Sequence, residues 1–398
     1  MTTNNAPAPD AARSSRCAAE LGSVQDRGML EWARQRPDDG FVIGVALRLR
    51  GPRPTPARLA ALLAARLPAL PGLAERLDGP TGQERWRPAE DFDAAHHVHT
   101  LDGAAEPHRG AELMANQPVC GDRPRWGLWL LDTPQEDEFL LAYRVHHAAQ
   151  DGTAVAHTIG RLLDARVPAL PTGRSPTDAG RWASAPPPGS DRLLAAADVP
   201  VEAMRAISRA SGASLNDVHL AALTGALRAW LPPGARDHPV PVRVPFNVRL
   251  RQERQDRGNR YGYKRVLLPV DEPSARQRLA QVVEQTSVWP RDRNRRLLDL
   301  IPDDLMRDHI SDFLSSQDSL ATVTLLGAHT PLALDGSPVT GGLALPPLIG
   351  GHLFSSVLFI HGARACLSVT AQRRHDHVRD LPRLWQRAVV ELATASCP

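Results

Sequence analysis

A stretch rich in proline, glycine and serine divides this chain into two parts. Residues 166–191, RVPALPTGRSPTDAGRWASAPPPGSD, have no periodic apolar face that a helix or a strand could bury. At 398 residues the chain is also too long for one ordinary hydrophobic core. Strand-like and helix-like segments are mixed on both sides of the break. We therefore expect an α+β fold of two lobes, at 21–165 and 192–398, joined by a linker at 166–191.

Hydrophobic periodicity indicates the elements of each lobe. In the first lobe it predicts strands at 41–50, 125–132 and 138–147, and helices at 56–67, at 110–117 and after Gly152. In the second lobe it predicts helices at 200–211, 214–230, 273–287, 302–315 and 380–395, and strands at 240–250, 261–270, 320–326, 353–360 and 364–371. Ser214 and Asp217 have the spacing of a helix-capping box. Residues 1–20 are expected to be a disordered lead.

Composition argues against several classes of protein. The chain is 42% hydrophobic and 23% charged with a net charge of +3, which is normal for a globular protein and no sign of nucleic-acid binding. Its four cysteines form no CxxC pair, so neither a zinc module nor a disulfide framework is expected. The most apolar stretch, 339–361, contains two adjacent prolines and is interpreted as two strands rather than a transmembrane segment. Residues 1–17 lack the apolar region of a signal peptide, so we expect a cytoplasmic protein.

The motif HHxxxDG carries the most chemistry in the sequence. Because side chains alternate along a strand, only one of His146 and His147 can face a cleft. A neutral imidazole can take a proton from a hydroxyl or an amine while that group attacks a carbonyl. Asp151 lies in the turn before a helix, and a buried aspartate needs a partner, for which arginine is best suited. Gly152 leaves its backbone open to a substrate chain.

The residues alone leave three interpretations of this motif open: a catalytic base with its support, half of a metal site, or a structural polar patch. A second cluster, His96, His97 and His99, contains ligands that suit zinc or iron. Neither cluster has HExxH spacing, so we expect no metal. The chain has no G-x-S-x-G elbow, no P-loop and no G-x-G-x-x-G after a strand. If this is an enzyme site, direct transfer with a histidine base therefore fits better than a covalent serine intermediate.

Several segments, taken in order, resemble one family. They are FDAAHHV (92–98), DRPRWGLWLLD (122–132), VHHAAQDGTA (145–154), SLNDVHLAALTGALRAWL (214–231), VPFNVR (244–249) and GNRYGYKRVLLPV (258–270). The order resembles the wax ester synthase/diacylglycerol acyltransferase group. That group is part of the chloramphenicol-acetyltransferase-like acyltransferases, which include the condensation domains of non-ribosomal peptide synthetases. The resemblance extends from about residue 26 to the C-terminus.

The resemblance implies a fold and a set of roles. It implies two chloramphenicol-acetyltransferase-like lobes in a V, with a central tunnel that donor and acceptor enter from opposite sides. His147 would be the base that activates the acceptor. The remaining expected site residues are His146 and Gly152 as support, Asp151 paired with Arg249 across the lobes, and Asn247 and Thr324 as substrate contacts.

Departures from the family pattern guide the expected function. The SNVPGP-type segment of the family falls on VTLLG, so Val323 and Thr324 replace its serine and asparagine. The chain is shorter than many of the group and has no obvious amphipathic helix for a membrane surface. We therefore expect a standalone condensation-type acyltransferase of specialised metabolism. A wax ester/diacylglycerol-type O-acyltransferase is the alternative, and a non-catalytic carrier-protein recruitment module is the rival of another class.

The expected donor is an acyl thioester, on coenzyme A or on a phosphopantetheinyl carrier protein. The expected acceptor is a small molecule with an amine or a hydroxyl group. We expect no tightly bound cofactor and a monomeric protein. The arginine-rich segment 249–265 has two interpretations: contact with donor phosphates or with the acidic face of a carrier, or a solvated loop that Glu253 and Asp256 interrupt.

Overall fold

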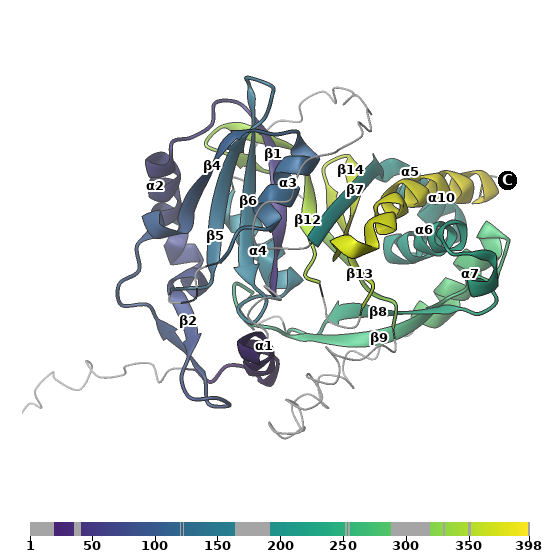
Figure 1. Ribbon diagram of the computed structural model, residues 1–398, viewed down its shortest axis with the longest axis horizontal. Helices are drawn as coiled ribbons and strands as arrows, with labels where there is room; N and C mark the ends of the chain where they lie inside the picture. The colour runs from purple at the N-terminus through teal and green to yellow at the C-terminus, as the bar shows by residue number, and fades with distance from the viewer. Residues whose placement is uncertain are drawn as a thin grey trace, which may run out of the picture.

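The computed structural model describes residues 20–35, 41–119, 121, 123–163, 192–250, 253, 255–287, 319–328, 331–348 and 352–396. These residues form two six-stranded sheets and a two-stranded hairpin, and helices pack on both large sheets (Figure 1). The prediction of a two-lobed α+β fold is confirmed. The predicted linker at 166–191, the helix at 302–315 and nearly all of the predicted lead lie outside the described residues.

The first sheet has the strand order β11-β12-β1-β6-β5-β4. Its strands are β1 (Val42–Arg50), β4 (Val98–Ala104), β5 (Trp126–Asp132), β6 (Glu138–His146), β11 (Ala333–Leu334) and β12 (Ser337–Leu345). Helices α2 (Pro56–Arg66) and α4 (Gly152–Leu162) pack on one face, and α3 (Pro107–Ala115) packs on the other. Burial on both faces explains why β5 and β6 are almost continuously apolar.

The two tryptophans of β5 illustrate this double burial. Trp126 lies in the core beneath α2 and α4, whereas Trp129 lies with Met114 in the core beneath α3. Residues three apart on a strand point to opposite faces, so the two indoles fill different cores.

The strands β11 and β12 come from the C-terminal half of the chain but belong to the first sheet. β12 pairs antiparallel with β1, and Gly44 lies opposite Leu345. The apolar stretch 339–361 does contain two strands, but they lie in different sheets. A division at residue 192 therefore does not separate the lobes cleanly, because residues 333–345 complete one edge of the first sheet.

The second sheet has the strand order β7-β14-β13-β10-β8-β9. Its strands are β7 (Arg192–Pro200), β8 (Val240–Asn247), β9 (Tyr261–Leu268), β10 (Ala321–Ala328), β13 (Phe354–His361) and β14 (Arg364–Gln372). Helices α5 (Val201–Ser211), α6 (Leu215–Trp230), α7 (Ala275–Thr286) and α10 (Leu381–Ser396) gather on its outer side (Figure 1). Among these elements the sequence patterns miss only β7.

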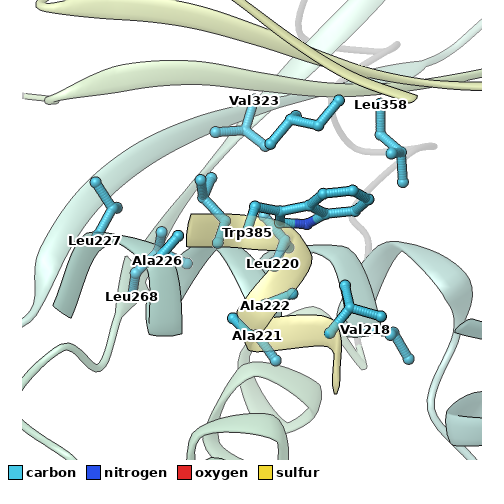
Figure 2. Packing of buried hydrophobic residues seen from close by; sticks show 14 of the residues in the cluster. Val218, Leu220, Ala221, Ala222, Ala226, Leu227, Leu268, Val323, Leu358 and Trp385 are labelled. Carbon is cyan, nitrogen blue, oxygen red and sulfur yellow. The ribbon is translucent and has the colours of Figure 1, made fainter. Parts of the chain in front are cut away.

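The core of the second lobe surrounds Trp385 of α10. This indole is fully buried between α6, represented by Leu220, and the sheet residues Val323 and Leu358 (Figure 2). The capping box predicted at the start of α6 is present, because the Asp217 backbone N–H donates to Ser214 Oγ and the Ser214 N–H donates to Asp217 Oδ2. Nearly every side of α6 is buried, as expected for a central core helix.

The smaller elements lie in both lobes, and the turns Pro233–Ala235 and Arg373–Asp380 belong to the second. These smaller elements are α1 (Val24–Gln35), the hairpin of β2 (Glu75–Asp78) and β3 (Arg85–Pro88), and the 3₁₀ turns Leu67–Ala69, Pro71–Ala74, Ala94–His97, Pro233–Ala235 and Arg373–Asp380. α1, which the sequence patterns do not predict, brings Asp26 to the region of HHxxxDG. Within the described ranges, no helix combines the length and apolarity needed to cross a membrane.

Candidate active site

His147 lies in the turn between β6 and α4, directly after the last residue of the strand. Its backbone N–H donates to the Phe41 carbonyl over 2.8 Å, and its ring stacks on the Phe41 ring with centroids 5.0 Å apart. Tyr261 of β9 faces the same imidazole, with ring centroids 6.2 Å apart. The half-buried His147 ring is therefore held between an aromatic residue at the edge of the first lobe and one from the second.

His146 occupies a different environment. Its side chain is buried, and its Nδ1 accepts a hydrogen bond of 3.2 Å from the Ala148 backbone N–H. Burial, with a smaller contribution from the charge of Arg125, lowers the pKa of His146 to about 3. His146 is therefore neutral at ordinary pH and supports the turn that presents its neighbour.

Burial also lowers the pKa of His147 below that of an ordinary histidine. A hydrogen bond to the backbone of His147 itself, the charge of Asp151, a hydrogen bond to Asn259 and the charge of Asp26 oppose this effect without cancelling it. The imidazole is consequently unprotonated at neutral pH, which is the form that can accept a proton.

Asp151 and Arg249 are brought together from positions 98 residues apart. Asp151 Oδ2 accepts from Arg249 Nη1 over 2.5 Å and from the Arg260 backbone N–H over 3.0 Å. Asp151 Oδ1 caps α4 by accepting from the Ala154 N–H over 3.0 Å. The side chains of the Asp151–Arg249 pair are 4% and 1% exposed, so this ion pair lies almost entirely out of water. The pair joins the start of α4 to the segment after β8.

Gly152 is the first residue of α4 and faces the second lobe. Among the described residues beyond its chain neighbours and the backbone of its own helix, a Cβ atom built there would find Leu326 of β10 alone within 4 Å, at 3.9 Å. Thr324 is half-buried and lies two residues before Leu326, on the same face of β10. Asn247 is exposed at the end of β8, where its Oδ1 accepts from the Arg249 backbone N–H over 3.0 Å. Thr324 therefore points to the same side of β10 as Leu326, and Asn247 contacts the backbone of Arg249.

Two residues close to His147 were missed from the sequence. Asn259 Oδ1 lies 3.1 Å from His147 Nδ1, and Asn259 is in turn hydrogen-bonded to Asp26. The segment that begins GN carries part of the family resemblance, but no local pattern marks its asparagine as a site residue. Asp26 gave no usable signal, because its helix was not predicted.

Three described arginines of the segment 249–265 make contacts within the protein. Arg257 pairs with Glu75 and Glu20 and lies over the Trp86 ring, 5.2 Å from its centroid. Arg249 pairs with Asp151, and Arg260 Nε lies 3.8 Å from a carboxylate oxygen of Glu253. These three guanidinium groups already face carboxylates, which argues against their use for donor phosphates.

The histidine cluster at 96–99 lies against the tryptophans of β5. His97 Nδ1 lies 2.9 Å from the Trp126 carbonyl oxygen, and the two rings stack with centroids 4.1 Å apart. His99 packs on Trp129 in a similar way, with centroids 5.0 Å apart. In the part of the chain that the structure describes, no three His, Cys, Asp or Glu side chains converge as metal ligands do.

The two lobes and the HHxxxDG turn at their seam define a protein with the chloramphenicol-acetyltransferase-like acyltransferase fold. Solved structures with this arrangement include a wax ester synthase/diacylglycerol acyltransferase from Marinobacter aquaeolei VT8, with a TM-score of 0.62 and 19% identity over 89% of this chain and 95% of that one. The starter condensation domain of rhizomide synthetase, a mutant in complex with C8-CoA, has a TM-score of 0.62 and 15% identity over 94% and 95% of the two chains.

Sequence comparison narrows the resemblance. Residues 44–185 match the family model of the wax ester synthase/diacylglycerol acyltransferase catalytic domain. A Mycobacterium tuberculosis protein named as a diacylglycerol O-acyltransferase is 24% identical in an alignment 247 positions long, which covers 52% of this chain and 54% of that protein. The chain thus spans about half the length of this curated relative. The resemblance predicted from the sequence is confirmed, and the comparisons favour the O-acyltransferase alternative over a condensation enzyme of specialised metabolism.

Proposed function

We propose that the protein is an O-acyltransferase of the wax ester synthase/diacylglycerol acyltransferase type. It moves an acyl group from an acyl thioester to a hydroxyl acceptor and releases the free thiol. The observation that carries the proposal is the neutral, half-buried His147 at the seam of the lobes, inside the segment that matches the catalytic-domain family.

The proposed reaction uses His147 as general base. An unprotonated ring nitrogen of His147 accepts the hydroxyl proton while the acceptor oxygen forms a bond to the thioester carbonyl carbon. The carbon–sulfur bond then breaks, and the thiolate takes the proton back from the imidazolium. The ester and the thiol are the only products, and no cofactor is consumed.

The roles of the supporting residues follow from their contacts. Asp151 and Arg249 hold the start of α4 against the second lobe, and His146 keeps the turn in place. Gly152 and Thr324 lie on the side of the seam next to β10, and we propose that the substrate chain passes there. Asn247 contributes indirectly through the Arg249 segment.

We propose coenzyme A as the carrier of the donor acyl group. A structural neighbour is described in complex with C8-CoA, which supports an acyl-CoA donor for this fold. A phosphopantetheinyl carrier protein presents the same thioester chemistry and is the second donor to test. With an amine acceptor the same reaction would form an amide instead of an ester. The assay should therefore include both hydroxyl and amine acceptors.

The test is a thiol-release assay with acyl-CoA and acyl-carrier donors of several chain lengths, each with a long-chain alcohol, a diacylglycerol or an amine. Mass spectrometry then distinguishes ester from amide products. We expect ester formation with an acyl-CoA donor. Release of thiol only with an amine would overturn the choice of acceptor, and no release with any pair would favour a non-catalytic module.

The first variant to measure is His147→Ala. Because it removes the base, we expect turnover to fall by about 10²–10⁴-fold while the circular dichroism spectrum stays unchanged. His238, an exposed histidine in a loop of the second lobe, provides the matched control His238→Ala, which should keep the wild-type rate. Wild-type turnover by His147→Ala would remove this residue from the mechanism.

A further inference from the structure

We infer that Asn259 is a positioning residue that fixes the tautomer of His147, and that Asp26 in turn fixes the orientation of Asn259. The inference rests on the proposed function, since it explains which ring nitrogen of the base receives the proton. It concerns a contact between residues 112 apart, at the junction of the HHxxxDG turn and the segment before β9.

The acceptors around Asn259 decide how its amide group points. Asn259 Nδ2 donates to Asp26 Oδ1 over 2.9 Å and to the His147 backbone carbonyl over 2.8 Å. Both of these partners are oxygens that accept hydrogen bonds. The amide NH₂ must therefore face them, because in the flipped orientation the amide oxygen would meet two other oxygens.

The orientation of the amide then decides the state of the imidazole. With its NH₂ group so placed, Asn259 presents Oδ1 to His147 Nδ1 at 3.1 Å. An amide oxygen only accepts, so Nδ1 must carry the hydrogen. In a neutral imidazole the other nitrogen, Nε2, then holds the free lone pair. The geometry assigns Nε2 as the atom that accepts the proton of the substrate.

Asp26 is itself fixed in place, so it can hold the side chain of Asn259 in one orientation. It lies in the first turn of α1 and is 1% exposed. Its Oδ1 also accepts from the Asn259 backbone N–H over 2.7 Å, and its Oδ2 accepts from the Ser23 backbone N–H over 2.9 Å. The carboxylate of Asp26 therefore accepts hydrogen bonds from both the backbone and the side chain of Asn259.

Gly258 allows this close approach. It has a φ of +72°, a conformation that favours glycine. A Cβ atom at this position would also lie 3.2 Å from Asp26 Oδ2. The dipeptide Gly258–Asn259 thus combines a backbone that can reach Asp26 with an amide that can reach His147.

A neutral amide at this position suits a base better than a carboxylate would. Asn259 directs the imidazole and shares the Nδ1 hydrogen of the imidazolium during the reaction, but it adds no negative charge that would hold the proton there. An aspartate in its place would lie directly beside the buried carboxylate of Asp26, and such like charges repel strongly out of water.

The experiment is ¹⁵N NMR of the full chain labelled at its histidine rings, because ring nitrogen shifts distinguish the two neutral tautomers. The signals of His147 are assigned by their loss in His147→Ala. We expect the Nδ1–H form in the wild type above the pKa of His147. In Asn259→Ala we expect a substantial Nε2–H population and a loss in kcat/KM of about 10- to 100-fold, as when an orienting partner of a ligand histidine is lost.

Asp26→Asn is the milder second variant, since it keeps the shape of the carboxylate but lets the Asn259 amide flip. We expect a mixture of tautomers and a smaller loss of activity. Asn116→Ala is the matched control, because it removes an amide that donates to the Glu112 carbonyl in α3. It should leave the His147 signals and the rate unchanged.

The tautomer measurement separates this inference from the proposed function. An Nε2–H tautomer in the wild type would overturn the inference, as would the same Nδ1–H tautomer in the wild type and in both Asn259→Ala and Asp26→Asn. If the tautomer follows Asn259 but no acyl thioester is consumed, the positioning role stands and the proposed activity falls.

Discussion

At the residue scale, the residues around His147 decide its protonation and its orientation. The sequence indicated a base and an aspartate with an arginine partner, and the resemblance named Arg249 as that partner. Asn259 could not be predicted, because its role depends on a hydrogen bond to a residue 112 positions away and on a helix with weak sequence signals. Local patterns report which face of an element is buried, but not which distant side chain will meet it.

The lowered pKa of His147 predicts the shape of the pH–rate profile. Protonation removes the base, so kcat/KM should fall as the pH drops through the pKa of His147. Because burial lowers that pKa, the acid limb should lie below the ordinary histidine value of about 6.5. Measuring kcat/KM from about pH 4.5 to 8 with one acyl-CoA donor tests this, and an acid limb centred above about 6.5 would contradict it.

At the scale of elements, strongly periodic segments were predictable and short or alanine-rich ones were not. α6 has a capping box and a long apolar run, so its limits followed from the sequence. β7 has three consecutive alanines, which carry little strand preference, and it forms because β14 pairs with it along its whole length. Its pairing partner lies more than a hundred residues along the chain, beyond the reach of any local pattern.

Helix α6 also contains a histidine whose burial makes stability depend on pH. His219 is fully buried edge-on to Trp385, and its ring nitrogens have no hydrogen-bond partner among the described residues. Burial lowers the pKa of His219 to about 3, whereas in the unfolded chain it returns to about 6.5. Between these values the unfolded state binds the extra proton, so stability is lost as the pH falls below about 6.5.

His219→Leu should therefore raise the free energy of unfolding by roughly 1 kcal/mol or more at neutral pH, because two buried polar atoms without partners are removed. The gain over the wild type should grow as the pH falls from 7.5 to 5. Urea unfolding at both pH values measures it, with His238→Leu at an exposed position as the control. An equal difference at the two pH values would show that His219 does not titrate on unfolding.

At the scale of the whole molecule, the Asp151–Arg249 pair joins elements of the two lobes. Both side chains are almost completely buried, so removing one partner leaves an uncompensated charge. Asp151→Ala should lower the free energy of unfolding by about 3–5 kcal/mol. Asp151→Asn keeps an acceptor that can cap α4 and thus separates the loss of the charge from the loss of the cap.

A double-mutant cycle with Arg249→Leu gives the coupling within the pair. The double variant should be destabilised by less than the sum of the two single variants, because the unpaired charge is gone from it. Urea unfolding of the four proteins provides the measurement. If the changes in the free energy of unfolding are additive, the ion pair does not stabilise the contact between the lobes.

The placement of β12 sets the order in which this protein can fold. Arg48 of β1 donates to Thr340 of β12 across 292 residues of chain, over 3.2 Å. During synthesis, β1 leaves the ribosome long before β12 has been made. The edge of β1 that pairs with β12 therefore stays unpaired while most of the second lobe is synthesised. Pairings of such long range are slow, and an open strand edge invites association with other chains. The pairing of β12 with β1 therefore both completes this part of the first sheet and removes an open strand edge at which aggregation could begin.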